Sequence, residues 1–182
     1  MAKGMKIIAW VSVLLTVLLT LLYQITLAAW LLSAGITAGT VAYHFWMRLA
    51  VGGLFDWLLN NKVDCSRKWF QVGPGEQRLY QFLKVRKWKK HLPTYDPNAF
   101  DKRQHPWKEI AEAMCQSELV HETIVILSFL PIGASVWFGA MPVFVVTSLL
   151  SALFDLLFVM IQRYNRPRVL KMVSAEQERA EK

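Results

Sequence analysis

Four long apolar stretches constrain the fold of this chain more than any other feature. They cover about residues 7–32, 34–59, 119–139 and 142–161 of a sequence of 182 residues. Because a helix rises about 1.5 Å per residue, about 20 apolar residues cross a hydrocarbon core of about 30 Å. The pattern therefore predicts an all-α integral membrane protein with four transmembrane helices. We expect one membrane domain over residues 1–182.

Basic residues are sorted unevenly among the segments that join these stretches. Two lysines precede the first stretch, twelve Lys or Arg lie in residues 60–118, and six lie in residues 162–182. The two other connections, residues 33–39 and 138–142, carry no charge. The positive-inside rule then places both termini, the central segment and the tail in the cytoplasm. We expect a multi-pass protein of the cell membrane, in contact with lipid and with no nucleic-acid partner.

The central segment predicts two helices of different character. After the chain breaker Gly73–Gly75, residues Arg78–Leu92 place apolar side chains on one side and basic ones around the rest. This pattern predicts a cytoplasmic amphipathic helix in the membrane interface between spans two and three. Pro93 ends that helix, and residues 94–105 favour a turn-rich loop. A second helix is expected to begin at Pro106 and to continue into the third span.

The cysteines and histidines give no sign of a metal site or a disulfide. Cys65 and Cys115 lie in segments expected in the cytoplasm, without a CxxC motif or a Cys/His ligand spacing around them. We therefore expect two reduced thiols. The four histidines also lack the spacing of metal ligands, so we predict no metal and no bound cofactor.

A histidine and two carboxylates gather where the chain is expected to enter the third span. Glu118 and His121 are three residues apart, so they share a helix face, and Glu122 lies one turn from Glu118. A histidine with a carboxylate on its own face is suited to act as a general base toward a hydroxyl group. The alternative is a polar cluster at the interface that only ends the span.

Ionisable residues also lie inside the expected spans. His44 and Arg48 are one turn apart in the second span, and Asp155 lies in the fourth. Charges are costly there unless they are paired or face a wet cavity. Our hypothesis is that Arg48 and Asp155 pair, and that they form with His44 and Glu122 a pocket whose mouth holds His121. A purely structural ion pair is the alternative.

The segment Gln162–Arg168 follows the last apolar stretch and holds three arginines, with Tyr164, Asn165 and Pro167 at fixed places between them. Ordinary positive anchoring needs only scattered Lys or Arg. The ordered pattern indicates a shaped binding surface.

Three motifs occur in a characteristic order: Val85–Lys89, Glu118–His121 and Gln162–Arg168. Together they resemble the glycosyl-4,4'-diaponeurosporenoate acyltransferase family, over about residues 81–171. Members of that family attach a fatty acyl group to a sugar hydroxyl of a glycosylated C30 carotenoid acid. This is the last step in carotenoid biosynthesis of the staphyloxanthin type.

The resemblance implies O-acyl transfer at the cytoplasmic membrane face, with acyl-CoA or acyl carrier protein as the donor substrate. It implies that His121 is the base and that Glu118 orients it. Basic and polar residues of the other two motifs would bind donor phosphates, the thioester oxyanion or the sugar. These residues are Arg86, Lys87, Trp88, Arg163, Tyr164, Asn165, Arg166 and Arg168.

Two residues depart from the pattern of that family and leave the acceptor open. Glu122 follows His121 where a tryptophan is expected, and Asp155 takes the place of an asparagine. The acceptor is then a carotenoid glycoside or a related glycolipid. Two other functions stay open: a membrane lipid hydrolase in which His121 and Glu122 activate water, and a non-enzymatic membrane adaptor. An adaptor should survive His121→Ala, whereas an enzyme should not.

Overall fold

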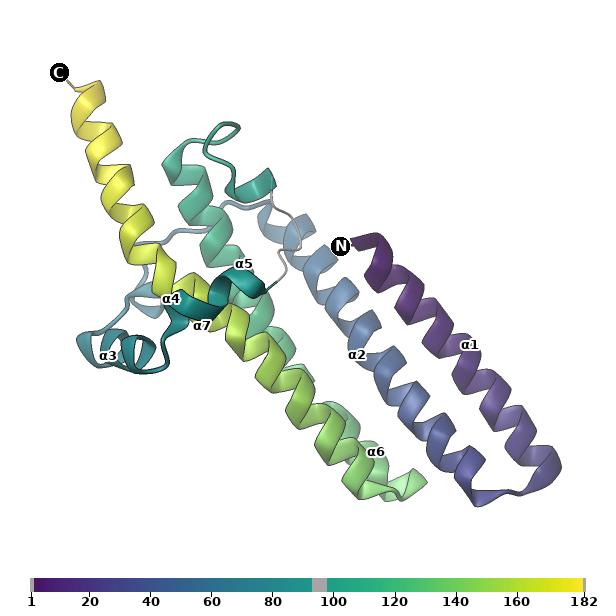
Figure 1. Ribbon diagram of the computed structural model, residues 1–182. Helices are drawn as coiled ribbons and strands as arrows, with labels where there is room; N and C mark the ends of the chain where they lie inside the picture. Colours follow the sequence, from purple (N-terminus) through teal and green to yellow (C-terminus); the bar gives the residue numbers. More distant parts are fainter. Residues whose placement is uncertain (1, 93–97, 182) are drawn as a thin grey trace. The chain divides into compact units, whose positions relative to one another are not determined.

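A computed structural model describes residues 2–92 and 98–181, and every regular element in them is a helix (Figure 1). The predicted all-α class is confirmed. Pro93 and residues 94–97 of the expected loop lie outside the described residues. The elements are α1 (Ala2–Thr26), α2 (Ala29–Leu59), η1 (Lys68–Phe70), α3 (Pro74–Phe82), α4 (Val85–Trp88), η2 (Lys89–His91), η3 (Asn98–Phe100), α5 (Trp107–Leu127), α6 (Leu130–Phe138) and α7 (Met141–Ala180).

The chain divides into two compact units, each of which is described by itself below. The apolar unit comprises Ala2–Gly53 and Thr123–Asp155. The basic unit comprises Leu54–Glu122 and Leu156–Lys182, and it therefore holds the central segment and the second half of α7.

Three helices in the described part of the chain are long and apolar enough to cross a membrane. They are Lys3–Thr26, Trp107–Phe138 and Met141–Ala180. The second predicted span lies in α2, which carries Arg48 and Asp56 and is not among the three. The protein is compatible with a membrane location, and the four-span arrangement stays a prediction.

The first turn of the chain differs from the sequence-based expectation. Helix α1 ends at Thr26, Leu27 adopts a positive φ of 55°, and residues 33–39 are helical, so the expected loop at 33–39 is wrong. The small residues there serve helix packing instead. A Cβ atom added at Gly35 would lie 3.6 Å from the Cβ atom of Leu19 in α1. Small residues let two helix backbones approach closely, and α1 and α2 form a hairpin (Figure 1).

A buried ion pair joins α2 to α7 within the apolar unit. Arg48 donates a hydrogen bond from Nη2 to Asp155, whose side chain is fully buried, so the predicted pairing is confirmed. The same nitrogen lies 2.8 Å from Ser151 Oγ, and Ser151 Oγ lies 2.9 Å from Ser128 Oγ. These hydroxyl groups surround the charges with polar partners, which a buried ion pair needs.

The Arg48–Asp155 pair gives a test of stability. Asp155→Leu leaves the Arg48 guanidinium buried without its carboxylate, and we expect a loss of about 3–5 kcal/mol in unfolding free energy. The double variant Arg48→Met with Asp155→Leu should recover most of that loss, because both charges are then removed. Thermal unfolding in detergent measures both. Equal stability of wild type and Asp155→Leu would contradict the role of the pair.

In the basic unit, the prediction of a single amphipathic helix over Arg78–Leu92 is wrong. Helix α3 ends at Phe82, and Lys84 adopts a left-handed backbone with φ 52°, so that α4 begins in a new direction. A left-handed residue cannot continue a right-handed helix. Trp88 Nε1 then donates to the carbonyl of Leu83 at 3.0 Å across the bend. The second expected helix is confirmed, because α5 begins at Trp107 directly after Pro106.

The prediction of two reduced thiols is also wrong. Cys65 and Cys115 form a disulfide whose Cα atoms lie 6.1 Å apart. The two cysteines are 50 residues apart in the chain, so no local motif predicts that they pair. Val63, Phe70 and Cys115 form a small buried core here, and this core holds the segment that follows α2 against α5.

Candidate functional site

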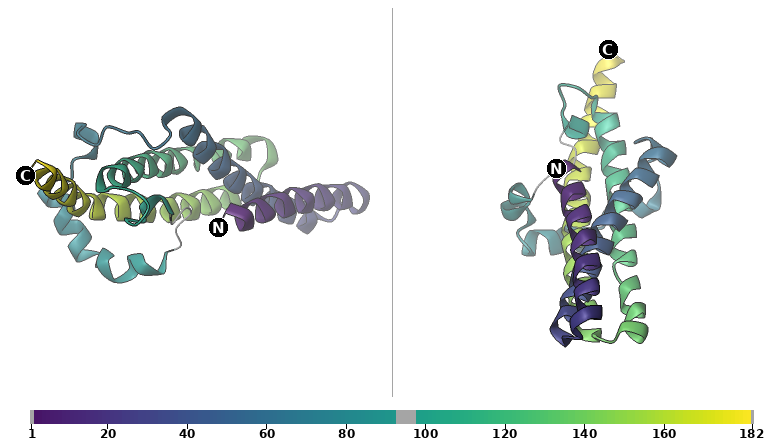
Figure 2. Two further views of the ribbon diagram at one scale, coloured as in Figure 1. Left: turned by 90° about the horizontal axis from the view of Figure 1, so that it is seen from above. Right: turned by 90° about the vertical axis from the view of Figure 1, so that its right-hand side faces the viewer.

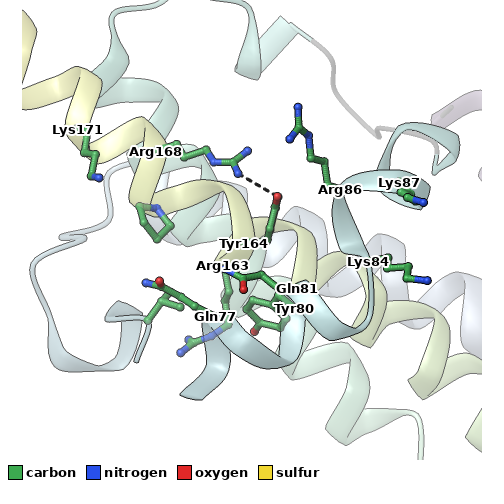
Figure 3. Close-up of a pocket in the computed structure, with 12 residues that line it drawn as sticks. Gln77, Tyr80, Gln81, Lys84, Arg86, Lys87, Arg163, Tyr164, Arg168 and Lys171 are labelled. Carbon is green, nitrogen blue, oxygen red and sulfur yellow. Dashed lines mark hydrogen bonds between the residues drawn. The ribbon is translucent and has the colours of Figure 1, made fainter. Parts of the chain in front are cut away.

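A cavity of about 590 Å³ opens in the basic unit between the α3–α4 region and the second half of α7 (Figure 3). Both views of Figure 2 show the short helices alongside this part of α7. Ligand pockets in proteins measure roughly 300–1,000 Å³, so the volume suits a small-molecule substrate. The lining residues are Val72, Gln77, Tyr80, Gln81, Lys84, Arg86, Lys87, Arg163, Tyr164, Pro167, Arg168 and Lys171.

The side chains of the arginine-rich motif of α7 lie on two different faces of the helix. Tyr164, Arg168 and Lys171 follow one another at spacings of four and three residues, which places them on one helix face, and all three line the cavity. Gln162 and Arg166, four residues apart, contact α5 instead. Gln162 Nε2 lies 3.1 Å from Ser117 Oγ, and Arg166 pairs with Glu118. One face therefore lines the cavity and the other packs against α5.

Glu118 is the centre of a buried ionic network. Its side chain is 0% exposed; Oε1 accepts a hydrogen bond from Arg163 Nη1 at 2.6 Å, and Oε2 accepts one from Arg166 Nη1. Arg166 is also 0% exposed and donates from Nη2 to the backbone carbonyl of Phe70. The network connects α5, α7 and the loop around η1. The structure thus gives Glu118 an anchoring role, and its predicted role in orienting His121 stays a prediction.

A second carboxylate completes the pairing of Arg163. Nη2 of Arg163 donates to Glu76 Oε2 at 2.9 Å, while Nη1 donates to the carbonyl of Trp69 at 3.0 Å. Hydrogen bonds from Arg163 are the main cause that holds the pKa of Glu76 below its ordinary value. Burial, followed by a hydrogen bond to Glu76, raises the pKa of Tyr80, so this hydroxyl stays protonated at neutral pH. Arg163 therefore ties α3 to α7 and forms a wall of the cavity.

Tyr164 is held in place by cations on the cavity side of α7. Arg168 Nη2 donates to the Tyr164 hydroxyl at 3.0 Å, and its guanidinium carbon lies 4.8 Å from the centre of the Tyr164 ring. Lys89 Nζ lies 5.0 Å from the same ring centre and also donates to Asn165 Oδ1. Cation–π contacts of this kind fix an aromatic ring between charges. Asn165 therefore positions Lys89 and does not line the cavity.

His121 lies on α5 against an aromatic ring of α7. Its imidazole stacks on Phe158 with ring centres 4.7 Å apart and planes 10° apart. Beside it, Glu122 Oε2 accepts a hydrogen bond from Trp69 Nε1 at 2.8 Å. The stacking defines the plane of the imidazole, and the assignment of His121 as a base stays a prediction.

The structure separates the predicted substrate-binding residues into two groups. Five of the eight line the cavity: Arg86, Lys87, Arg163, Tyr164 and Arg168. The other three make structural contacts, because Arg166 is fully buried, Asn165 holds Lys89, and Trp88 caps the bend before α4.

The predicted inner pocket is divided between the two units. His44, Arg48 and Asp155 belong to the apolar unit, where Arg48 Nη1 also donates to the His44 carbonyl at 3.0 Å. Glu122 belongs to the basic unit. A pocket built from these four residues stays a prediction.

Five polar residues of the cavity were not predicted from the sequence: Gln77, Tyr80, Gln81, Lys84 and Lys171. Lys171 could have been predicted from its spacing, since it lies three residues after Arg168 on the same face of α7. Lys84 carried no such signal, because the sequence pattern placed it inside a continuous helix. Gln77 and Tyr80 lie on α3, which the long-range pair of Arg163 with Glu76 links to α7.

A comparison with protein families supports the motifs from which the site was expected. The family model described as glycosyl-4,4'-diaponeurosporenoate acyltransferase matches residues 66–175. Every residue that lines the cavity falls in the matched range. No curated protein and no solved structure matches the chain.

The buried network predicts a large effect of a small substitution. Glu118→Gln keeps the shape of the side chain but leaves two guanidinium groups facing a neutral amide. We expect a loss of about 3–5 kcal/mol in unfolding free energy, the usual effect of breaking a buried pair. Thermal unfolding in detergent measures it. Glu112→Gln on the same helix is the matched control and should change stability by less than about 0.5 kcal/mol; similar losses in both variants would contradict the model of a central carboxylate.

The lowered pKa of Glu76 predicts a pH dependence. A carboxylate whose folded pKa lies below its ordinary value of 4.5 contributes stability above that value and loses it as the pH falls through the folded pKa. The difference in melting temperature between wild type and Glu76→Gln should stay constant from about pH 8 to about pH 6 and shrink below about pH 4.5. A difference that grows on acidification would show that the ion pair does not stabilise the fold.

Proposed function

The chain belongs to the glycosyl-4,4'-diaponeurosporenoate acyltransferase family, and from this membership we propose that it moves a fatty acyl group from an activated thioester donor to a sugar hydroxyl. The acceptor is a glycosylated carotenoid or a related glycolipid. The family is one of acyltransferases, so the class of reaction follows directly. The acceptor and the roles of single residues are our proposal.

One observation carries the proposal: the cavity with its cationic lining lies wholly within the range that the family model matches. An activated acyl donor ends in phosphate groups, and arginine and lysine side chains bind phosphates well. The neutral sugar of the acceptor has no comparable need for charge. The cavity is therefore assigned to the charged end of the donor.

We assign the base of the reaction to His121. It removes the proton of the attacking sugar hydroxyl while the hydroxyl oxygen forms a bond to the thioester carbonyl carbon. The carbon–sulfur bond then breaks, the thiolate leaves, and the proton passes from the imidazole to the thiolate. Stacking on Phe158 at 4.7 Å supports this assignment, because it fixes the plane in which the ring nitrogens lie.

We place the reaction at the cytoplasmic face of the cell membrane. The basic segments 60–118 and 162–182 favour that side, where negatively charged lipids attract Lys and Arg. The Cys65–Cys115 disulfide in the first of these segments argues against it, because disulfides are rare in the cytoplasm. A lipid acceptor reaches the enzyme from the bilayer, and a water-soluble donor reaches it from the cytoplasm. Both termini are cytoplasmic in this arrangement.

Mass spectrometry of extracted lipids tests the proposal. Cells that make the glycosylated carotenoid express wild type, His121→Ala or the control His105→Ala, in which a half-buried histidine that pairs with Glu109 outside the cavity is removed. We expect an acyl ester with wild type and the control, and at least about a hundredfold less with His121→Ala, the usual contribution of a general base.

Other outcomes separate the alternatives. Release of free fatty acid without an ester would point to a hydrolase. An ester from His121→Ala at the wild-type level would keep the transferase and remove His121 from the chemistry. No ester from any of the three proteins, with each present in the membrane, would contradict the carotenoid glycoside as acceptor.

A further inference from the structure

The cationic lining of the cavity contains more charge than the protein neutralises. Six of its residues are basic, and none of the lining residues within the described ranges 2–92 and 98–181 is acidic. Arg163 is paired with Glu76 and Glu118. The remaining cations are Lys84, Arg86, Lys87, Arg168 and Lys171. In the part of the chain that the structure describes, none of these five forms a salt bridge.

The five cations come from two separate elements that face the same space. Lys84, Arg86 and Lys87 stand on the bend and α4, whereas Arg168 and Lys171 stand on α7 (Figure 3). Lys84 is held in the left-handed conformation, with φ 52°. Such backbone strain collects at ligand-binding positions. Charge from two directions suits a ligand with more than one phosphate group.

The charges in this region also repel one another. Burial lowers the pKa of Lys89, and the nearby cations Arg168 and Arg86 lower it further. Nearby positive charges disfavour protonation of a lysine. Binding of a polyanion would relieve this repulsion.

We propose that this cavity binds the adenosine 3',5'-bisphosphate end of coenzyme A, so that the acyl donor is acyl-CoA rather than acyl carrier protein. The inference rests on the proposed acyl transfer. The 3'-phosphate and the diphosphate of coenzyme A carry about four negative charges at pH 7, which approaches the five positive charges of the lining. The phosphopantetheine arm of an acyl carrier protein holds one phosphodiester and would leave most of them unpaired.

Binding measured by titration calorimetry tests this without any acyl transfer. The purified full-length chain in neutral detergent is titrated with coenzyme A, with dephospho-coenzyme A, which lacks only the 3'-phosphate, and with 4'-phosphopantetheine. We expect dephospho-coenzyme A to bind about tenfold more weakly and 4'-phosphopantetheine about a hundredfold more weakly, as charge-assisted hydrogen bonds are lost.

Charge-removing variants locate the site. Lys84→Gln, Arg86→Gln and Lys171→Gln should each weaken coenzyme A binding by about fivefold to tenfold. Lys108→Gln removes the same charge from an exposed position of α5 outside the cavity and should leave the affinity unchanged. Equal losses in all four variants would show that net charge alone attracts the ligand and would overturn the site.

Three further results would overturn the proposal. These are equal affinity for coenzyme A and dephospho-coenzyme A, displacement of coenzyme A by micelles containing phosphatidylglycerol at similar concentration, and ester formation from acyl carrier protein without any binding of coenzyme A. The last result would leave the proposed transferase intact. Coenzyme A binding with the expected selectivity but without ester formation would support the site while removing the proposed function.

Discussion

The buried carboxylate of Glu118 is the interaction on which the basic unit depends. It receives one guanidinium from Arg163 and another from Arg166, and both its own side chain and that of Arg166 are fully buried. Charges leave water at a cost of several kcal/mol each, so such a cluster persists only when its members are paired and hydrogen-bonded. Here the second carboxylate, Glu76, pairs with Arg163, and the carbonyl of Phe70 accepts a hydrogen bond from Arg166. The requirement brings α3, α5, α7 and the η1 loop together at one place.

Charge balance in this network explains the character of the neighbouring cavity. Inside the network the charges of two carboxylates and two guanidinium groups cancel. These carboxylates therefore do not neutralise the other cations along the cavity. The backbone that carries them is held by the neutral network, because Arg163 joins α3 to α7 through Glu76. Lys89 adds a second link to α7 through Asn165. A rigid frame with a surplus of positive charge suits binding of a phosphate-bearing donor, since little ordering is required when the ligand arrives.

The sequence predicted elements and charges better than it predicted contacts. Hydropathy predicted the helical class, and the pairing of Arg48 with Asp155 followed from the cost of lone charges in an apolar helix. The bend at Lys84 was not predicted, because Arg78–Leu92 contains no Gly or Pro that would mark a left-handed residue. The Cys65–Cys115 disulfide was not predicted either, because the two residues are far apart in the sequence and only the folded chain brings them together. Local spacing linked Glu118 to His121, and that role stays a prediction; no local pattern indicated the two arginines more than 40 residues away that contact Glu118.

In the arginine-rich motif, neighbouring arginines make different contacts and have to be considered one by one. Arg166 and Arg168 are two residues apart, and about 100° of helical rotation per residue turns them to different sides of α7. Arg166 faces α5 and is fully buried, whereas Arg168 faces the cavity and holds Tyr164. Loss of Arg166 would therefore act on the fold and only indirectly on the ligand, while loss of Arg168 would act on the ligand directly. The compact motif was predicted from the sequence as one binding surface, whereas in the structure one of its faces packs against α5 and the other lines the cavity.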